Sequence, residues 1–183
     1  DKKVSVKNLL TGQEYEISYD KLILSPGASP IVPPIPGVER ALTLRTVEDV
    51  ERIVARVDQK PSSAVVIGGG FIGVEIAENL IHRGIKTSVI EASDQVLAPL
   101  DPEMASLVAK EMISHGVDLQ LGVSASVIGS HTVTLSDDSE IPADLVILAI
   151  GVRPEINLAK AAGIKIGTRN GIEVDDYNRT SDL

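Results

Sequence analysis

The chain contains no cysteine and no tryptophan, and aromatic residues make up only 2% of its 183 residues. Without cysteine, it has no disulfide, no thiolate metal site and no cysteine-based redox step of its own. Because aromatics are scarce, the core has to be aliphatic, which suits parallel strands that are buried on both faces. No run approaches the roughly 18–20 apolar residues of a membrane span, and no signal-peptide pattern opens the sequence. We therefore expect a cytoplasmic protein.

Basic residues are fewer than acidic ones: the chain has 17 Lys and Arg and 26 Asp and Glu, and its formal net charge is −9. This balance disfavours nucleic acid or an anionic membrane as the main partner, because neither would gain basic steering or counterion release. A small anion such as a dinucleotide is still compatible with this net charge, since a local loop can bind it despite the negative electrostatic field of the whole chain. We expect no metal site, and we interpret two sets of side chains as surface and turn residues: the scattered His82, His115 and His131, and the acidic Asp137, Asp138 and Glu140.

Strand and helix patterns alternate along most of the chain. We expect strands at residues 3–6, 14–18, 22–24, 64–67, 86–91 and 145–150, the third of them buried, with short strands and turns over 117–142. Helical spacing covers 46–57 with Thr46 as N-cap, 71–83, a stretch from the capping pair Asp101-Pro102 to Gly116, and 156–162. Five prolines and two glycines in 26–37 indicate a stiff connector at a domain boundary. The order predicts an α/β fold, a Rossmann-like parallel sheet with helices on both faces plus a small antiparallel β-meander.

The most informative motif is the glycine loop Gly68-Gly69-Gly70-Phe71-Ile72-Gly73, which follows four apolar residues of strand type and opens a helical pattern. In this context G-x-G-x-x-G predicts a dinucleotide site. Gly68 permits the tight turn, Gly70 leaves the backbone bare for a pyrophosphate, and Gly73 lets the helix pack on the strand. Free N–H groups and the positive end of the helix dipole then face the phosphate. Glycines that serve only a tight turn are the competing interpretation.

Glu91 ends the predicted strand 86–91, eighteen residues after Gly73. A carboxylate at this place can accept hydrogen bonds from the adenosine ribose hydroxyls. A 2′-phosphate would meet a negative charge instead, and Ala92-Ser93-Asp94 supplies no cation. The sequence therefore predicts NADH in preference to NADPH, with Glu91 and the adjoining Ala92 at the ribose. A solvated glutamate at a strand end, without a ligand, is the competing interpretation.

Three segments of the sequence, in the right order, resemble the pyridine nucleotide-disulfide oxidoreductase family, the flavoprotein reductases that bind two dinucleotides. Residues 66–77 resemble the NAD-binding motif of that family, 19–30 the passage out of its flavin domain, and 143–154 the passage back. Residues 95–104 further resemble the subgroup of coenzyme A-disulfide reductases, NADH oxidases and peroxidases, and persulfide reductases. The resemblance implies that NAD(H) and FAD are the cofactors of the full-length protein.

The resemblance also implies roles for residues beyond the glycines. Phe71 would be an aromatic gate over the nicotinamide pocket. Glu75, on the first turn of the helix, would point toward the nicotinamide and the flavin, although a favourable charge near a helix N-terminus explains it as well. Ile150 and Gly151 would contact the cofactor, whereas a structural turn explains Gly151 equally well.

Several family elements are absent from this sequence, namely the N-terminal FAD glycine motif, the redox cysteine, the later Gly-Asp of the flavin site and the dimerisation domain. We therefore expect a fragment with a partial FAD-domain segment and linker at 1–40, an NAD(H)-binding domain at 41–151 and a partial FAD-domain return segment at 152–183. Ser25, Pro26 and Gly27 would contact FAD in the parent protein but cannot hold it alone. The fragment would have no catalytic residue and no turnover. The parent would be a homodimer, and the fragment a monomer or an edge-paired dimer.

Two other functions stay open on the residues alone. A free-standing NAD-binding sensor or interaction module would use the same loop without any chemistry. A complete dehydrogenase would need a catalytic acid or base and a substrate pocket, and the sequence indicates neither. The electron acceptor of the parent, whether disulfide, persulfide, peroxide or oxygen, is not encoded in these residues.

Overall fold

The computed structural model describes residues 2–182, and the chain divides into two compact units. The larger unit, Ala28–Pro154, holds a five-stranded sheet and three long helices. The described residues on either side of it form the second unit. Within the described range, none of the helices combines the length and the apolarity that crossing a membrane requires.

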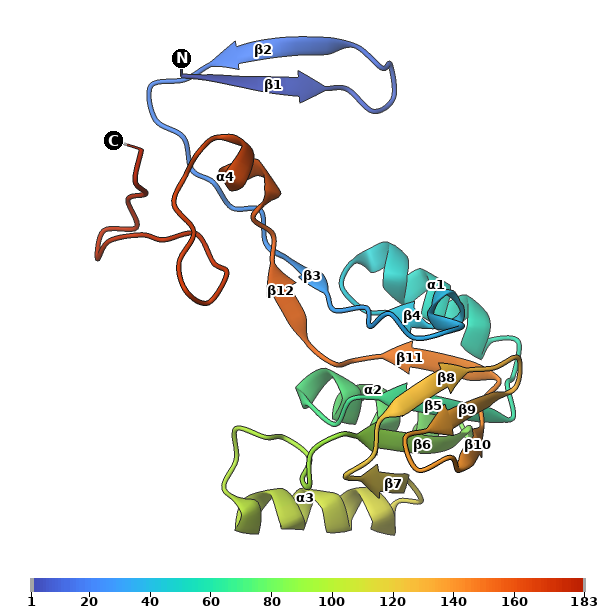
Figure 1. Ribbon diagram of the computed structural model, residues 1–183. Helices are drawn as coiled ribbons and strands as arrows, with labels where there is room; N and C mark the ends of the chain where they lie inside the picture. Colours follow the sequence, from blue (N-terminus) through green and yellow to red (C-terminus); the bar gives the residue numbers. More distant parts are fainter. Residues whose placement is uncertain (1, 183) are drawn as a thin grey trace. The chain divides into compact units, whose positions relative to one another are not determined.

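The larger unit is built on a parallel sheet with the strand order β4-β11-β5-β6-β7 (Figure 1). In this sheet Val66 of β5 lies opposite Val89 of β6 and Ile147 of β11. The side chains of β5 and β11 are almost all buried and aliphatic, as strands covered on both faces require. The strands are β4 (Leu42–Thr43), β5 (Ser63–Ile67), β6 (Lys86–Glu91), β7 (Asp118–Leu121) and β11 (Leu145–Leu148).

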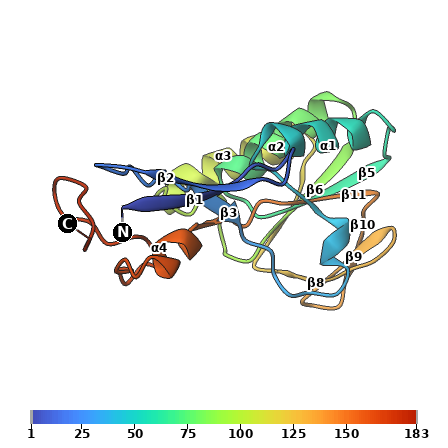
Figure 2. The same cartoon turned by 90° about the horizontal axis from the view of Figure 1, so that it is seen from above.

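Three helices, α1 (Val47–Val57), α2 (Phe71–His82) and α3 (Pro102–Ser114), lie together on one face of this sheet (Figure 2). Their apolar side chains pack on Val66, Val89 and Ile147. The helix start expected at Thr46 is confirmed by a capping box, in which the Thr46 hydroxyl accepts from the Asp49 N–H and the Asp49 carboxylate accepts from the Thr46 N–H. Asp101 stands at the N-cap of α3, but the cap expected from its side chain is wrong, because it makes no capping hydrogen bond.

The opposite face of the sheet is covered by an antiparallel meander and a short 3-10 helix, not by α-helices. Val65 and Ile67 point to this side, because successive strand residues face opposite ways, and they pack against Ile128, Val133 and Leu135. The predicted α/β fold with a parallel sheet and a meander is confirmed, whereas the expected helices on both faces are wrong. The covering elements are η1 (Val38–Arg40), β8 (Ala125–Ile128), β9 (Thr132–Leu135) and β10 (Glu140–Pro142).

Two segments at the ends of the larger unit pair with each other, β3 (Ala28–Pro30) and β12 (Val152–Pro154). The proline-rich stretch that follows β3 packs on the meander, where the Ile128 N–H donates to the Pro36 carbonyl at 2.9 Å. A Cβ on Gly37 would lie 1.8 Å from the Ile128 carbonyl oxygen, so the close approach requires glycine.

The second unit contains the hairpin that the alternation predicts and one short helix. The elements are β1 (Lys3–Lys7), β2 (Glu14–Ser18) and α4 (Asn157–Ala161). The strand expected at 22–24 is wrong, since these residues are irregular and Ile23 is 92% exposed. Its three apolar residues have no neighbouring strand to pair with among the described residues, and an apolar run alone does not make a strand.

Candidate functional site

The glycine loop lies where the strand order of the sheet changes direction. From β5 the chain continues through α2, β6, α3 and β7, and the strands β6 and β7 lie on one side of β5. Strands β11 and β4 lie on the other side of β5. Residues 68–70 follow β5 and residues 149–151 follow β11, so both segments stand at the carboxyl ends of neighbouring parallel strands. In open α/β sheets, the crevice at such a switch point is where ligands bind.

Gly68 and Gly73 are required by contacts within the chain. Gly68 has a φ of +113°, and a Cβ on it would lie 2.5 Å from the Ala149 carbonyl oxygen. A Cβ on Gly73 would lie 1.9 Å from the Gly68 carbonyl oxygen. The first glycine therefore lets the turn lie against the end of β11, and the third lets α2 pack directly on the turn.

Gly70 differs, because no contact within the described chain requires a glycine there. A Cβ would meet no atom within 4 Å, and its φ of −76° is one that any residue adopts. Gly70 is also the N-cap of α2, where Ser, Thr, Asp or Asn would satisfy a free N–H, and it supplies no such side chain. A bare backbone at this point suits a ligand that approaches closely, and glycines that serve only a tight turn do not explain it.

The first turn of α2 offers unpaired hydrogen-bond donors. Among the described residues, the N–H groups of Phe71, Ile72 and Gly73 have no acceptor, and the first helical bond runs from the Val74 N–H to the Gly70 carbonyl. No acidic side chain occupies this turn. Orphan donors at the positive end of a helix dipole attract an anion, and the open space at Gly70 gives an anion access to them.

The Glu91 carboxylate, at the end of β6, lies against the same loop. Its Oε2 accepts a hydrogen bond from the Gly69 N–H at 2.7 Å, and its Oε1 accepts from the N–H and the hydroxyl of Ser93 at 2.9 and 2.7 Å. Partial burial acts to raise the pKa of Glu91, but these hydrogen bonds outweigh it and hold the pKa below the ordinary value of 4.5. At neutral pH Glu91 is therefore an ionised carboxylate fixed beside the loop.

The chain that follows β6 holds both polar groups of Gly69. Glu91 accepts from its N–H, and the Leu97 N–H donates to its carbonyl oxygen at 2.8 Å. Leu97 is buried and has a φ of +48°, a left-handed conformation that is uncommon for leucine and is found at functional sites. The expectation that the N–H groups of the loop face a phosphate is thus wrong for Gly69, whose N–H is already used.

Comparison with protein-family models covers the whole sequence. The model described as pyridine nucleotide-disulphide oxidoreductase matches residues 1–183. The chain belongs to this family. An NADH oxidase from Enterococcus faecalis is 33% identical over 189 residues, which cover 99% of this chain and 42% of that protein. The chain thus spans about two fifths of the length of such relatives in the family.

Solved structures of the family agree with this assignment. A reduced Bacillus anthracis protein described as CoADR-RHD is 48% identical, with a TM-score of 0.96 over 99% of this chain and 34% of that one. A NAD-dependent persulfide reductase from A. fulgidus is 38% identical, with a TM-score of 0.94 over 99% and 34%. A water-forming NADH oxidase from Lactobacillus brevis, bound to NADH, is 30% identical, with a TM-score of 0.89 over 98% and 41%. The family predicted from the sequence is confirmed, and its members use NAD(H) and FAD.

The remaining predicted site residues of the larger unit lie in the loop or near it in the sequence of elements. Phe71 and Ile72, the first residues of α2, are 63% and 42% exposed. Glu75 is exposed on the second turn of α2, not on the first turn as expected. Ile150, two residues after the end of β11, is 37% exposed, and Gly151 has a φ of +106°, so the turn itself requires that glycine. The exposure of Phe71 excludes a core role for the chain's single phenylalanine.

Two further sets of predicted residues are exposed. Ala92 follows Glu91 at the end of β6 with its side chain in solvent. Ser25, Pro26 and Gly27 belong to the second unit, in irregular chain, and the Gly27 carbonyl accepts from the Glu155 N–H at 3.0 Å. Because these three residues are exposed, they do not fit FAD as a site of their own.

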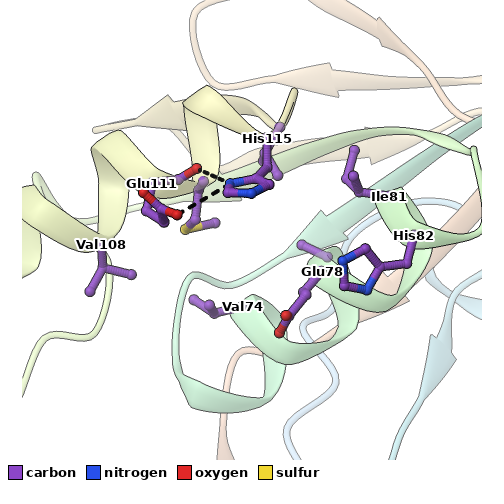
Figure 3. Close-up of a pocket in the computed structure, with 10 residues that line it drawn as sticks. Val74, Glu78, Ile81, His82, Val108, Glu111 and His115 are labelled. Carbon is purple, nitrogen blue, oxygen red and sulfur yellow. Dashed lines mark hydrogen bonds and ion pairs between the residues drawn. The ribbon is translucent and has the colours of Figure 1, made fainter.

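A groove between α2 and α3 is a second place where a ligand could lie (Figure 3). It has a volume of about 320 Å³ and is lined by aliphatic side chains and by Glu78, His82, Glu111 and His115. The lining contains two carboxylates and neither lysine nor arginine, so a pyrophosphate would meet net negative charge there. Within the described residues no group of His, Asp and Glu has the arrangement of a metal site. The glycine loop is therefore the better candidate for a dinucleotide.

Three residues that shape the site were not predicted as site residues from the sequence, namely Ser93, Val96 and Leu97. Val96 is fully buried, and its Cγ1 lies 3.1 Å from where a Cβ on Gly69 would stand. The only local signal for Ser93 is its place two residues after a glutamate at a strand end. The contacts of Val96 and Leu97 arise when the chain folds back over the loop, and no local pattern indicates them.

Proposed function

We propose that this chain is the NAD(H)-binding portion of an FAD-dependent, NADH-dependent disulfide or persulfide reductase of the coenzyme A-disulfide type. The observation that carries the proposal is the open space at Gly70, directly before the unpaired N–H groups of α2. A pyrophosphate suits this place, because it needs a close backbone approach and several N–H donors. Glu91 lies next to the same loop, where the ribose attached to that pyrophosphate would follow.

The same geometry supports a preference for NADH over NADPH. The hydroxyls of the adenosine ribose can donate to the ionised Glu91, and a hydrogen bond to a charged group contributes about 1.5–3 kcal/mol. A 2′-phosphate would place its negative charge against the same carboxylate. The residues that follow, Ala92, Ser93 and Asp94, offer no cation to offset this repulsion.

In the reaction, this chain's residues would bind and orient the donor. The first turn of α2 would hold the pyrophosphate, Glu91 would fix the adenosine end, and the exposed Phe71 would cover the nicotinamide end. The flavin supplies the hydride acceptor when it is bound in the full-length protein. Because the sequence contains no cysteine, we propose that the disulfide or persulfide chemistry takes place on residues outside it, and that the chain alone binds NADH without oxidising it.

Calorimetric titration of the chain with NADH and with NADPH tests the proposal. We expect one NADH site, and an NADPH affinity that is lower by roughly ten-fold or more, as the loss of a charged hydrogen bond implies. Glu91→Gln should weaken NADH binding and narrow the difference between the two cofactors. Glu78→Gln makes the same chemical change in the groove between α2 and α3 and should alter neither affinity. Failure of the wild type to bind NADH would overturn the function, and tighter or equal NADPH binding would overturn the preference.

A further inference from the structure

Ser93 holds one oxygen of the Glu91 carboxylate with two hydrogen bonds. Its N–H and its hydroxyl both donate to Oε1, at 2.9 and 2.7 Å. Ser93 is itself held in place, since its carbonyl oxygen accepts from the Gly122 N–H at 2.8 Å. Its hydroxyl has a single proton, for which the neutral Gln95 carbonyl at 2.9 Å competes with the ionised carboxylate at 2.7 Å, and the charged acceptor at the shorter distance is favoured. A short loop after β6 therefore determines how the carboxylate is turned.

The hydrogen bonds leave the carboxylate with little spare capacity. An ionised carboxylate has about four acceptor positions, two on each oxygen. Ser93 occupies the two on Oε1, and Gly69 occupies one on Oε2. The open position is thus on Oε2, the oxygen that already contacts the glycine loop.

We propose that Ser93 is a positioning residue for ribose recognition, which holds Oε1 of Glu91 so that Oε2 lies at the glycine loop and presents its open acceptor position to a ribose hydroxyl. The inference rests on the proposed function, since it assigns Glu91 to the ribose of a dinucleotide. Ser93 acts through Glu91 and does not touch the ligand. The terminal torsion of a glutamate is broad, so without the Ser93 hydroxyl the carboxylate turns more freely.

A loosely held carboxylate affects the two cofactors differently. NADH loses affinity, because the acceptor for its ribose hydroxyl has to be ordered on binding. NADPH loses less, because a mobile carboxylate can turn away from the 2′-phosphate. The ratio of the two dissociation constants therefore reports the position of Glu91, which a merely structural role of Ser93 would not change.

The test compares the wild-type chain with three variants. Ser93→Ala removes the hydroxyl that holds Glu91, and Ser93→Thr keeps it. Ser106→Ala is the control, because it removes an exposed hydroxyl on α3 that donates to the Glu103 carbonyl. Calorimetry with NADH and NADPH should show that Ser93→Ala weakens NADH binding by about 3- to 10-fold, the usual effect of one lost hydrogen bond, and lowers the NADPH-to-NADH ratio of Kd values. The Thr variant should bind like the wild type, and so should the Ser106 variant. Carbon NMR of the Glu91 carboxyl in the ligand-free chain should show its pKa raised in Ser93→Ala.

The outcomes separate this inference from the proposed function. If the wild type binds NADH and Ser93→Ala keeps its affinity and its ratio, the positioning role is overturned while the NADH site stands. The positioning role is also overturned if Ser93→Ala loses affinity equally for NADH and NADPH while the pKa of Glu91 is unchanged, since this result indicates a general loosening of the fold. If the wild type binds neither cofactor, the proposed function fails and this inference falls with it, whatever the Glu91 titration shows.

Discussion

Alanine at Gly70 and alanine at Gly73 add the same methyl group three residues apart, and the structure predicts opposite effects. At Gly73 the new Cβ would lie 1.9 Å from the Gly68 carbonyl oxygen and 3.4 Å from the Ala149 Cβ, so α2 has to move away from the sheet. Overpacking of this kind costs about 1–3 kcal/mol. Each kcal/mol lowers Tm by roughly 2–4 °C in a domain of this size. We expect a decrease of roughly 2–12 °C, toward the upper end because the clash is with backbone.

At Gly70 the methyl group meets no atom of residues 2–182 within 4 Å, and the φ of −76° suits alanine. Alanine is a poorer N-cap than glycine but restricts the unfolded chain, and these two effects oppose each other at less than about 1 kcal/mol each. We therefore expect a Tm within about 2 °C of the wild type. The same methyl group stands where we propose the pyrophosphate, so the NADH affinity should fall by at least about ten-fold, or 1.4 kcal/mol.

Thermal unfolding followed by circular dichroism and an NADH fluorescence titration measure the two effects separately. Gly171→Ala is a matched control, because that glycine has open space around it and lies in the second unit. Both its Tm and its NADH affinity should stay at the wild-type values. The reasoning is refuted if Gly70→Ala binds NADH as tightly as the wild type, or if it destabilises the fold as much as Gly73→Ala does, since Gly70 would then serve the fold.

Three further predictions concern single side chains. Because the pKa of Glu91 lies below 4.5, NAD⁺ affinity measured by calorimetry should be constant from about pH 7 to pH 5. A fall in NAD⁺ affinity within this pH range would contradict the prediction. Hydrogen bonds from Ser62, then His131 and Ser63, hold the pKa of Asp144 far below 3.8, so its stabilising effect is present above pH 3.8 and is lost as the pH falls below that value. Asp144→Asn should unfold at lower urea than the wild type at pH 7 and show a smaller further loss in acid. Thr46→Ala breaks the capping box of α1, which should cost about 1 kcal/mol and lower Tm by roughly 2–4 °C without changing NADH affinity.

The elements that could be predicted are those whose signals are local. Strand β6 matches the expected residues 86–91, and α2 begins after the glycine loop, because an apolar run, a helical period and flanking glycines all lie within a few residues. The single-sided helix layer could not be predicted in this way. The second face of the sheet is covered by the meander, because the chain after β7 crosses to that side. The strand pattern of residues 117–142 does not indicate to which side the chain crosses.

In the candidate site, too, the features with a local sequence signal could be predicted and those that depend on the fold could not. The glycine loop and Glu91 follow from residue types at fixed spacing, and the structure brings them within hydrogen-bond distance of each other. The direction of the Gly69 N–H and the left-handed Leu97 could not be foreseen, because both depend on the chain after β6 folding back over the loop. Compartment and oligomeric state stay predictions from composition and family resemblance.

The bond between Gly69 and Glu91 leads to a last prediction, on changing the cofactor preference. Glu91→Arg would place a cation near a 2′-phosphate, but it would leave the Gly69 N–H without its acceptor, and an unpaired buried donor costs about 1–3 kcal/mol. Glu91→Gln keeps one acceptor for the Gly69 N–H, although its amide NH2 then faces the Ser93 N–H, and Ala92→Arg adds a cation at an exposed position. The double variant should bind NADPH more tightly than NADH, and its Tm should fall less than that of Glu91→Arg, which should lose several degrees because it leaves both N–H groups without an acceptor. If Glu91→Arg unfolds at the wild-type Tm, the carboxylate does not hold the loop, and its part in the site is confined to the ligand.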